Sequence, residues 1–286
     1  MATAIGIVYT LVTAENKMLM DAAKARGAEV EKISDAEISM EITTEKTAVP
    51  DRIDIVLSRS SSLGRSLYST AFFESCGVPV LNKYAVQALC SDKALTSIAL
   101  ARAGVPTPKT YVAFTPESVA AADKLGYPCV MKPVIGSWAR LVTKIGDPEV
   151  LRAVTEHREE LGSYMHKIYY LQQWVEKPGR DIRAIVVGDE VIAAIYRNSG
   201  EGEWITNTAR GGIATNCPVT GELAEICLKA SDCVGRGVLG VDLMETDDGL
   251  VVHEINHSLE FRNSVAPTGV DIPGKIIDYA TSIAKT

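Results

Sequence analysis

The chain has 286 residues, with 29 Lys and Arg against 36 Asp and Glu, and a formal net charge of −7 at pH 7. This length is enough for a substantial core and more than one domain. No apolar run approaches the roughly 20 residues of a membrane-spanning helix, and a net acidic chain without a Lys/Arg block is a poor nucleic-acid binder. We therefore expect neither a membrane nor a nucleic-acid partner.

Neither the start of the chain nor its cysteines indicate an exported protein. Residues 1–9 contain no basic segment followed by a cleavable apolar stretch, so we expect a cytoplasmic protein. No two cysteines have the two-residue spacing of a zinc knuckle, and reduced thiols are expected in the cytoplasm. The six cysteines are Cys76, Cys90, Cys129, Cys217, Cys227 and Cys233.

The first ninety residues alternate between short apolar runs and helical patterns. Such βαβ alternation predicts a small parallel sheet covered by helices on both faces. No glycine fingerprint follows the first apolar run, which argues against a dinucleotide-binding site and a dehydrogenase. The predicted strands are 5–9, 30–33, 53–57 and 78–81, and the predicted helices are 14–26 and 65–76.

The pattern changes after a helix that begins near Asp92. The prolines of residues 105–108 exclude a helix there and predict a linker. We divide the chain into units of residues 1–90, 91–165 and 166–286. The strands predicted beyond the linker are 110–113, 129–132, 141–145, 168–175, 182–187, 191–196, 238–244 and 250–255. The helices predicted there are 116–125, 148–161, 220–234 and 272–284.

Two lysines and a small-residue loop indicate a phosphate site. Lys93 stands at a helix start, and Lys132 ends an apolar strand, where an ammonium group needs a partner such as a phosphate. The loop 136–140 follows that strand, and its small residues allow backbone N–H groups to approach a polyphosphate. Either lysine alone is also compatible with a surface position, and the loop with a plain strand-to-strand turn.

Three oxygen-bearing side chains indicate a magnesium site. Asp242 lies within a predicted strand, while Glu254 and Asn256 have the i,i+2 spacing that points both to one face of the next strand. The turn 246–249 makes the two strands a hairpin, which brings Asp242 beside the other two. Carboxylate and amide oxygens are ligands that Mg²⁺ prefers. The alternative, that the three residues are merely polar side chains on the solvent face of the hairpin, fits poorly because their neighbours in the sequence are apolar.

Cationic and amide side chains follow in the last third of the chain. Arginines on strands offer bidentate forks for a carboxylate or a phosphate, and a loop rich in Thr, Asn and Gly offers many hydrogen-bond donors. A solvated charged face explains any one of the arginines but not the whole set. The set comprises Arg180, Arg183, Arg197, Asn207 and Arg210.

Together these stretches resemble the ATP-grasp superfamily, and in particular its RimK-type carboxylate–amine ligases. The resemblance covers nearly the whole chain and is strongest to the branch that joins α-aminoadipate to the amino-group carrier protein LysW in lysine biosynthesis. It implies an ATP-grasp fold of the α/β (α+β) class with an N-terminal pre-ATP-grasp βαβ domain. The residues that carry it are 91–93, 131–138, 175–183, 204–212 and 254–257.

The resemblance also implies a role for each matching residue. Lys93 and Lys132 would contact the phosphates of ATP, and Gly136 and Ser137 would cap them. The hinge beside adenine would be Gln173, Trp174 and Val175, and Asp181 would contact the ribose. Mg²⁺ would be bound by Asp242, Glu254 and Asn256. The catalytic residues would be Arg183, Arg197 and Asn207, and the amino acid would contact Arg197, Asn207, Thr208, Ala209 and Arg210.

The sequence departs from the family pattern in three places. Ala139 stands where the phosphate loop usually has a second glycine, which would stiffen that loop. Gln173 replaces a glutamate at the hinge, although backbone contacts to adenine would survive the change. The loop 199–203 is slightly longer than usual, so its substrate contacts are not defined by the resemblance.

The implied reaction has two steps. ATP phosphorylates the side-chain carboxylate of the carrier's C-terminal glutamate, and the α-amino group of the amino acid then attacks the acyl phosphate. No Ser/His or Cys/His nucleophile is required, so none of the four histidines is assigned this role. They are His157, His166, His253 and His257. The carrier is acidic, and Arg59, Arg65 and Lys83 are candidates for a basic docking patch. Family members commonly form homo-oligomers, so we expect a dimer or a tetramer.

Several alternatives remain open at this stage. A sister branch uses glutamate for arginine biosynthesis, and one enzyme could serve both acids because they differ by one methylene, worth only about 1–3 kcal/mol of discrimination. The stretch 206–212 is more similar to the aminoadipate type. A glutamate ligase with another acceptor and a nucleotide-binding regulator without turnover are more distant alternatives, and the intact set of magnesium ligands argues against the regulator.

Overall fold

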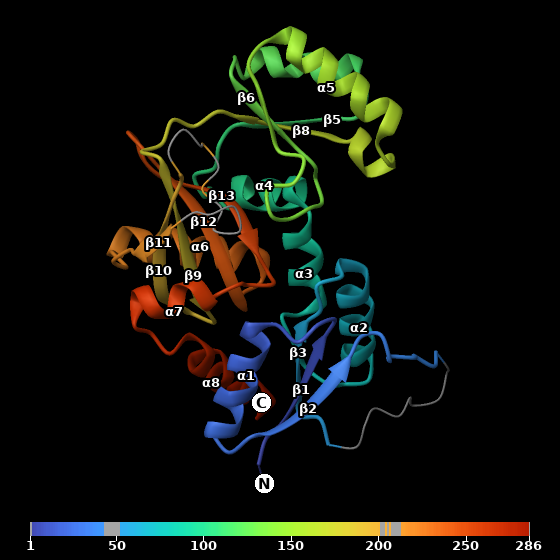
Figure 1. Cartoon of the computed structure of the whole chain (residues 1–286), viewed down its shortest axis with the longest axis vertical. Coiled ribbons are helices and arrows are strands. Elements are labelled where there is room, and N and C mark those ends of the chain that lie inside the picture. Colours follow the sequence, from blue (N-terminus) through green and yellow to red (C-terminus); the bar gives the residue numbers. More distant parts are fainter. Residues whose placement is uncertain (1, 43–51, 201–203, 205, 207–212, 286) are drawn as a thin grey trace.

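The computed structural model describes residues 2–42, 52–200, 204, 206 and 213–285. Three sheets follow one another along the molecule (Figure 1): an N-terminal sheet of four strands, a central sheet of four strands at the opposite end, and a C-terminal sheet of five strands between them. No helix in the described ranges combines the length and hydrophobicity that a membrane crossing requires. The architecture confirms the predicted mixed α/β class.

The N-terminal sheet is parallel, as predicted, with the strand order β2-β1-β3-β4. Ile5 and Ile7 pack on one face against two helices, α1 and α8, whereas Val8 and Val56 pack on the other face against Phe73 of α2. Helices therefore cover both faces. The elements are β1 (Ala4–Tyr9), α1 (Ala14–Ala25), β2 (Glu29–Ser34), β3 (Ile55–Arg59), α2 (Leu63–Ser75), β4 (Val80–Leu81) and α8 (Ile272–Ala284).

The central sheet is antiparallel, in the order β5-β8-β6-β7. Asp147 accepts hydrogen bonds from the N–H groups of Glu149 and Val150, and this N-cap followed by proline fixes the start of α5. The helix predicted over 116–125 is the 3₁₀ helix η1. The elements are β5 (Thr110–Ala113), η1 (Glu117–Lys124), β6 (Cys129–Lys132), β7 (Thr143–Ile145), α5 (Pro148–Leu161), η2 (Tyr164–Lys167) and β8 (Tyr169–Gln173).

One predicted domain boundary is displaced. The division at residue 165 assigns β8 to the last unit, but β8 pairs with β5 and β6, so the central sheet extends to Gln173. Sequence periodicity identifies a strand without identifying its partners, because pairing depends on contacts between segments far apart in the chain. The linker predicted at 105–108 is indeed neither helix nor strand.

The C-terminal sheet is antiparallel, in the order β11-β10-β9-β12-β13. One face packs on helices α3, α4 and α6. On the other face, Ile185 and Val187 at one end of β9 pack against α8, whereas Asp181 and Arg183 at the other end face a pocket. The elements are α3 (Tyr84–Ser91), α4 (Lys93–Arg102), β9 (Arg180–Val187), β10 (Glu190–Asn198), β11 (Ile213–Asn216), α6 (Gly221–Val234), β12 (Val238–Thr246), β13 (Gly249–Asn256) and α7 (Arg262–Thr268).

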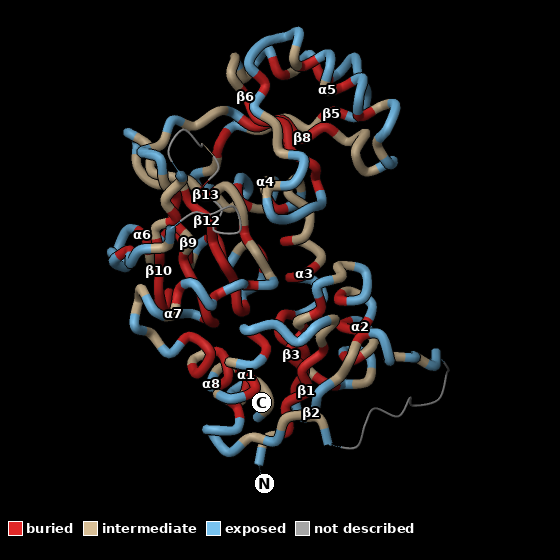
Figure 2. The backbone as a smooth tube through the Cα atoms, in the orientation of Figure 1, coloured by how far each residue is buried: buried red, intermediate tan, exposed pale blue. Residues whose placement is uncertain are grey.

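Burial follows the sheets: buried residues concentrate on the strands and exposed residues on the outer helix faces and loops (Figure 2). All six cysteines carry free thiols. Burial raises the pKa of Cys90 and of Cys227 to about 12, so both are protonated, inert thiols at neutral pH. Their packing is consistent with a structural role.

Asn82 joins the N-terminal unit to the C-terminal sheet. Its side-chain N–H groups donate to the carbonyls of Val238 at 2.8 Å and His257 at 2.6 Å, and its Oδ1 accepts from the Val238 N–H at 2.7 Å. The side chain is only 4% exposed. Truncation would leave buried polar groups unpaired, so Asn82→Ala is expected to lower the free energy of unfolding by about 2–4 kcal/mol.

Urea denaturation measures this effect. Asn198→Ala is the matched control, because the Asn198 amide donates two hydrogen bonds, at 3.1 and 3.2 Å, from a partly exposed position on β10. We expect the control to cost about 1 kcal/mol or less. Equal stability of Asn82→Ala and the wild type would contradict the assignment of Asn82 as an interdomain link.

Candidate functional site

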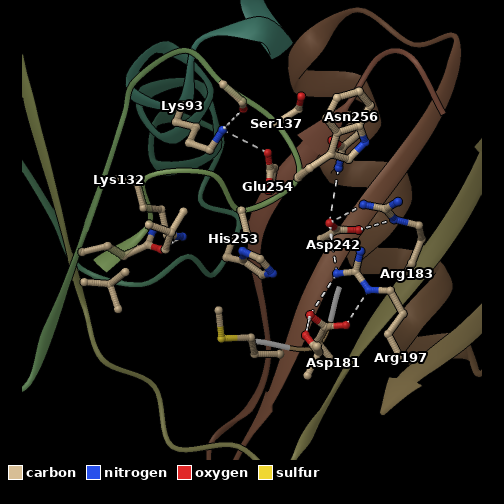
Figure 3. Close-up of a pocket in the computed structure, with 18 of the residues that line it drawn as sticks. Lys93, Lys132, Ser137, Asp181, Arg183, Arg197, Asp242, His253, Glu254 and Asn256 are labelled. Atoms are coloured by element: carbon tan, nitrogen blue, oxygen red, sulfur yellow. Dashed lines mark hydrogen bonds and ion pairs between the residues drawn. The ribbon is translucent and has the colours of Figure 1, made fainter. Parts of the chain in front are cut away.

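A pocket lies on the uncovered end of the C-terminal sheet and is closed on its other side by the central sheet (Figure 3). Every described residue to which the resemblance assigns a role lines it: Lys93, Lys132, Gly136, Ser137, Gln173, Trp174, Val175, Asp181, Arg183, Arg197, Asp242, Glu254 and Asn256. Arg180 of the predicted cationic set instead pairs with Glu245 and does not line the pocket. The predicted substrate residues Asn207, Thr208, Ala209 and Arg210 lie outside the described residues. The structure therefore brings the predicted set together, and the individual roles stay predictions.

The β12–β13 hairpin positions the carboxylates. Asp242 pairs directly with Glu254 across the two strands, and Asn256 pairs with Gly240 two residues further along. The Asn256 amide lies 3.3 Å from a carboxylate oxygen of Asp242. Because the hairpin turn falls where the sequence predicted it, the three side chains share the pocket face of the sheet.

Two arginines hold the buried Asp242. Arg183 donates from Nε and Nη2 to its two carboxylate oxygens, both at 2.7 Å, and Arg197 Nη2 lies 3.1 Å from one of them. Burial alone raises the pKa of Asp242, but the two guanidinium groups outweigh it and hold that pKa well below its usual range. Asp242 is therefore ionised at any pH at which the protein would work.

Arg197 also binds Asp181. It donates to the two oxygens of that carboxylate at 2.6 and 2.9 Å, and both side chains are about 95% buried. Burial lowers the pKa of Arg197, but the charges of Asp242 and Asp181 raise it above its ordinary value. Figure 3 shows the resulting chain of alternating charges from Arg183 through Asp242 and Arg197 to Asp181.

Two lysines face the carboxylates from the opposite wall. Lys93 Nζ donates to the Gly136 carbonyl at 2.7 Å and lies 3.2 Å from Glu254. Lys132 Nζ donates to Gln172 Oε1 at 2.6 Å and forms no ion pair within the described ranges. Burial lowers the pKa of Lys132 to about 8. Its charge is thus held in the pocket without a counter-charge, which suits an anionic ligand.

The loop after β6 has an unusual backbone. Trp138 and Ala139 have φ angles of 58° and 50°, in the left-handed region that costs a non-glycine residue about 1–2 kcal/mol. This is where the sequence departs from the glycine of the family pattern. At the hinge, the Gln173 N–H donates to the Lys109 carbonyl at 2.8 Å, so this N–H is already engaged within the sheet.

Several pocket residues were missed from the sequence, among them Lys177, Gln172 and His253. Lys177 Nζ donates to Thr206 Oγ1 at 3.2 Å, and burial lowers its pKa. Gln172 holds Lys132, and a glutamine inside an apolar strand was the available signal. His253 has both ring nitrogens buried without a hydrogen-bond partner in the described structure, and burial lowers its pKa well below the ordinary value.

The three candidates for a basic docking patch differ in how their charges are held. The partly buried Arg59 contacts the C-terminal unit, where its Nη1 donates to the Leu259 carbonyl at 3.0 Å. Arg65 is paired with the buried Asp35 at 2.8 Å. Sequence alone shows that an arginine is present but not which partner takes its charge. Arg65 and Lys83 are both exposed, so a docking role for these residues stays a prediction.

The donor set fits a magnesium ion held together with a polyphosphate. Among the described residues no three His, Cys, Asp or Glu side chains gather as a metal-binding group, so an ion here relies on two carboxylates, one amide and substrate oxygens. That is how Mg²⁺ is usually held in nucleotide sites, where it keeps few protein ligands. The lysines on the opposite wall can take the remaining phosphate charge.

Comparisons with known proteins agree with this geometry. Residues 90–280 match the RimK-like ATP-grasp domain, and residues 5–89 match the LysX preATP-grasp domain. The α-aminoadipate–LysW ligase LysX of Saccharolobus solfataricus is 35% identical over 95% of this chain and 98% of its own length. The glutamate–LysW ligase ArgX of Sulfurisphaera tokodaii is 36% identical over 80% of this chain and 82% of its own.

A solved structure extends the likeness to the whole fold. The RimK domain ATP-grasp protein of Sphaerobacter thermophilus has a TM-score of 0.78 at 23% identity and covers 98% of this chain and 100% of its own. Family models and relatives together span all three sheets described above. The chain therefore belongs to the RimK-like ATP-grasp ligases and carries the pre-ATP-grasp domain of that family at its N-terminus.

Proposed function

We propose that the protein is an ATP-dependent ligase that joins the α-amino group of α-aminoadipate to the γ-carboxyl of the C-terminal glutamate of the carrier protein LysW. The observation that carries the proposal is the pocket in which Lys93 and Lys132 face the carboxylates of Asp242 and Glu254. Likeness to an α-aminoadipate–LysW ligase over 95% of the chain supports this choice of substrates. A nucleotide-binding regulator would not need the carboxylate hairpin.

In this proposal the nucleotide lies between the two sheets. Lys93 and Lys132 bind its phosphates, Gly136 and Ser137 cap them, and residues 173–175 border the adenine. Asp181 contacts the ribose through Oδ1, which has a second lone pair beside the one that Arg197 uses, whereas Oδ2 accepts from both Arg197 and Thr206. Mg²⁺, when held by Asp242, Glu254 and Asn256, neutralises charge on the phosphate groups.

The reaction then needs positioning and charge stabilisation rather than a protein nucleophile. A carboxylate oxygen of the carrier attacks the γ-phosphorus, and ADP leaves. Arg183 and Arg197 stand at the Asp242 end of the pocket, where they stabilise negative charge on the phosphoryl group as it moves. The α-amino nitrogen of the amino acid next attacks the acyl carbon, and phosphate leaves with the bonding electron pair.

A glutamate ligase, or one enzyme for both acids, is the second candidate. The relative that uses glutamate is 36% identical over 80% of the chain, so the likeness alone does not separate the two acids. The stretch 206–212, which is similar to the aminoadipate type, favours α-aminoadipate. Measurement of kcat/KM for both acids with one carrier distinguishes these candidates. A ratio of about 10–200 in favour of α-aminoadipate is expected for one methylene in a fitted pocket. A ratio near one would indicate a bifunctional enzyme.

Nucleotide affinity is expected to fall with rising pH. Burial lowers the pKa of Lys132 to about 8, so in the free enzyme this lysine loses its positive charge above pH 8. In the complex, the negative charge of the bound phosphate keeps Lys132 protonated. The Kd for ADP should therefore rise about tenfold between pH 7 and pH 9. All three tryptophans line the pocket, so their fluorescence reports binding. Lys132→Met should bind more weakly with little pH dependence, and a flat wild-type profile would contradict the phosphate role of Lys132.

A further inference from the structure

Glu260 differs from the other carboxylates that line the pocket. Three of the four are already paired with cations: Asp181 with Arg197, Asp242 with Arg183 and Glu254 with Lys93. Glu260 forms no direct ion pair within the part of the chain that the structure describes, and its charge acts on Arg59 only at longer range. It accepts one hydrogen bond, from Trp138 Nε1 at 3.0 Å, which links it to the loop over the pocket.

The segment that carries Glu260 is held in place from the N-terminal unit. The Leu259 carbonyl accepts the Arg59 hydrogen bond at 3.0 Å, and Arg262 lies 3.7 Å from Glu15 of α1. Leu259 and Phe261, on either side of Glu260, are each 1% exposed. The carboxylate is therefore presented from a fixed backbone at the edge of the pocket, four residues beyond the predicted metal ligand Asn256.

The proposed substrates bring one organic cation to this pocket. ATP and the carrier's glutamate are anionic, and the lysines and arginines of the pocket are matched to them. The α-amino group of the amino acid arrives as an ammonium ion, which has no lone pair and must lose a proton before it can attack. A carboxylate that is not engaged in a direct ion pair can bind such an ammonium ion and accept its proton.

Resting on the proposed function, we propose that Glu260 binds the α-ammonium group of the amino-acid substrate and accepts its proton before attack. The freed lone pair forms the C–N bond to the acyl carbon, and the C–O bond to phosphate breaks. Phosphate leaves with that electron pair and takes the second proton of the nitrogen, so the products are the amide and hydrogen phosphate. Trp138 holds the carboxylate toward the pocket.

Glu260→Gln tests this role, with Glu176→Gln as a matched control. Glu176 also accepts a hydrogen bond from a tryptophan Nε1, that of Trp174 at 2.6 Å, but it does not line the pocket. Each variant is assayed with ATP, Mg²⁺ and carrier, once with α-aminoadipate and once with hydroxylamine, which is uncharged at neutral pH and traps the acyl phosphate as a hydroxamate. Tryptophan fluorescence checks that ADP still binds.

Glu260→Gln is expected to ligate α-aminoadipate about 100-fold more slowly while forming hydroxamate at the wild-type rate. Its remaining ligation should rise with pH as the free amine becomes available, and Glu176→Gln should behave as the wild type in both reactions. Wild-type ligation by Glu260→Gln would overturn the inference, as would an equal loss of both reactions, because the defect would then precede amine attack. If the wild-type enzyme forms neither product, the proposed function itself fails, and this inference fails with it.

Discussion

Asp242→Asn is expected to reduce ligation about a thousandfold while the fold is retained. The substitution removes a carboxylate oxygen from the magnesium set and weakens the hold on Arg183, which donates two hydrogen bonds of 2.7 Å to Asp242. Arg197 keeps its bidentate pair with Asp181, so one buried guanidinium retains a counter-charge. Loss of carrier ligation, with a thermal transition still present, is the measurement that checks this.

The matched control for Asp242→Asn lies on the same strand. Glu245 also forms a bidentate ion pair across to β9, with Arg180 at 2.7 and 2.8 Å, but neither residue lines the pocket. Glu245→Gln should therefore ligate at the wild-type rate. If Asp242→Asn were as active as Glu245→Gln, Asp242 would not be part of the metal and phosphate machinery.

Arg197→Met is expected to lower the free energy of unfolding by about 3–5 kcal/mol and to stop ligation. Methionine fills much of the same space, so the cost comes from charge: Asp181 and Asp242 would remain buried without the guanidinium between them. Lys177, 3.8 Å from Asp181, is too distant to replace both hydrogen bonds. Urea denaturation of purified protein gives the stability change.

Arg180→Met separates burial from ion pairing as the cause. Arg180 makes an equally short bidentate pair and also lies 3.8 Å from the centroid of the Tyr196 ring, but its side chain is 34% exposed. Solvent screening limits its expected cost to about 1 kcal/mol. If both substitutions lowered the free energy of unfolding equally, burial of the charges around Arg197 would not be the cause of its effect on stability.

Much of the site could be predicted because it depends on short-range spacing. The i,i+2 relation of Glu254 and Asn256, and the turn before them, placed both side chains beside Asp242 without knowledge of the rest of the fold. Lys132 was recognisable because an ammonium group at the end of a buried strand requires a partner. In each case a local pattern and a single electrostatic rule sufficed.

Other features depend on contacts that no local pattern encodes. A β-bulge in β13 leaves His253 without a partner on the neighbouring strand. Val252 before it faces the core, whereas His253 and Glu254 both face the pocket. Simple alternation would have turned His253 away. The hydrogen-bond partner of Arg59 is 200 residues distant, so no local pattern could show that its guanidinium contacts the C-terminal unit.

The most direct test of the proposed function is the intact mass of a LysW-type carrier after incubation with the enzyme, ATP, Mg²⁺ and α-aminoadipate. We expect each carrier molecule to gain one aminoadipyl residue, with one ADP released per ligation. A carrier that lacks its C-terminal glutamate should gain nothing. No mass change on the intact carrier with either α-aminoadipate or glutamate would contradict the carrier-ligase function and would leave a RimK-like ligase with a different acceptor.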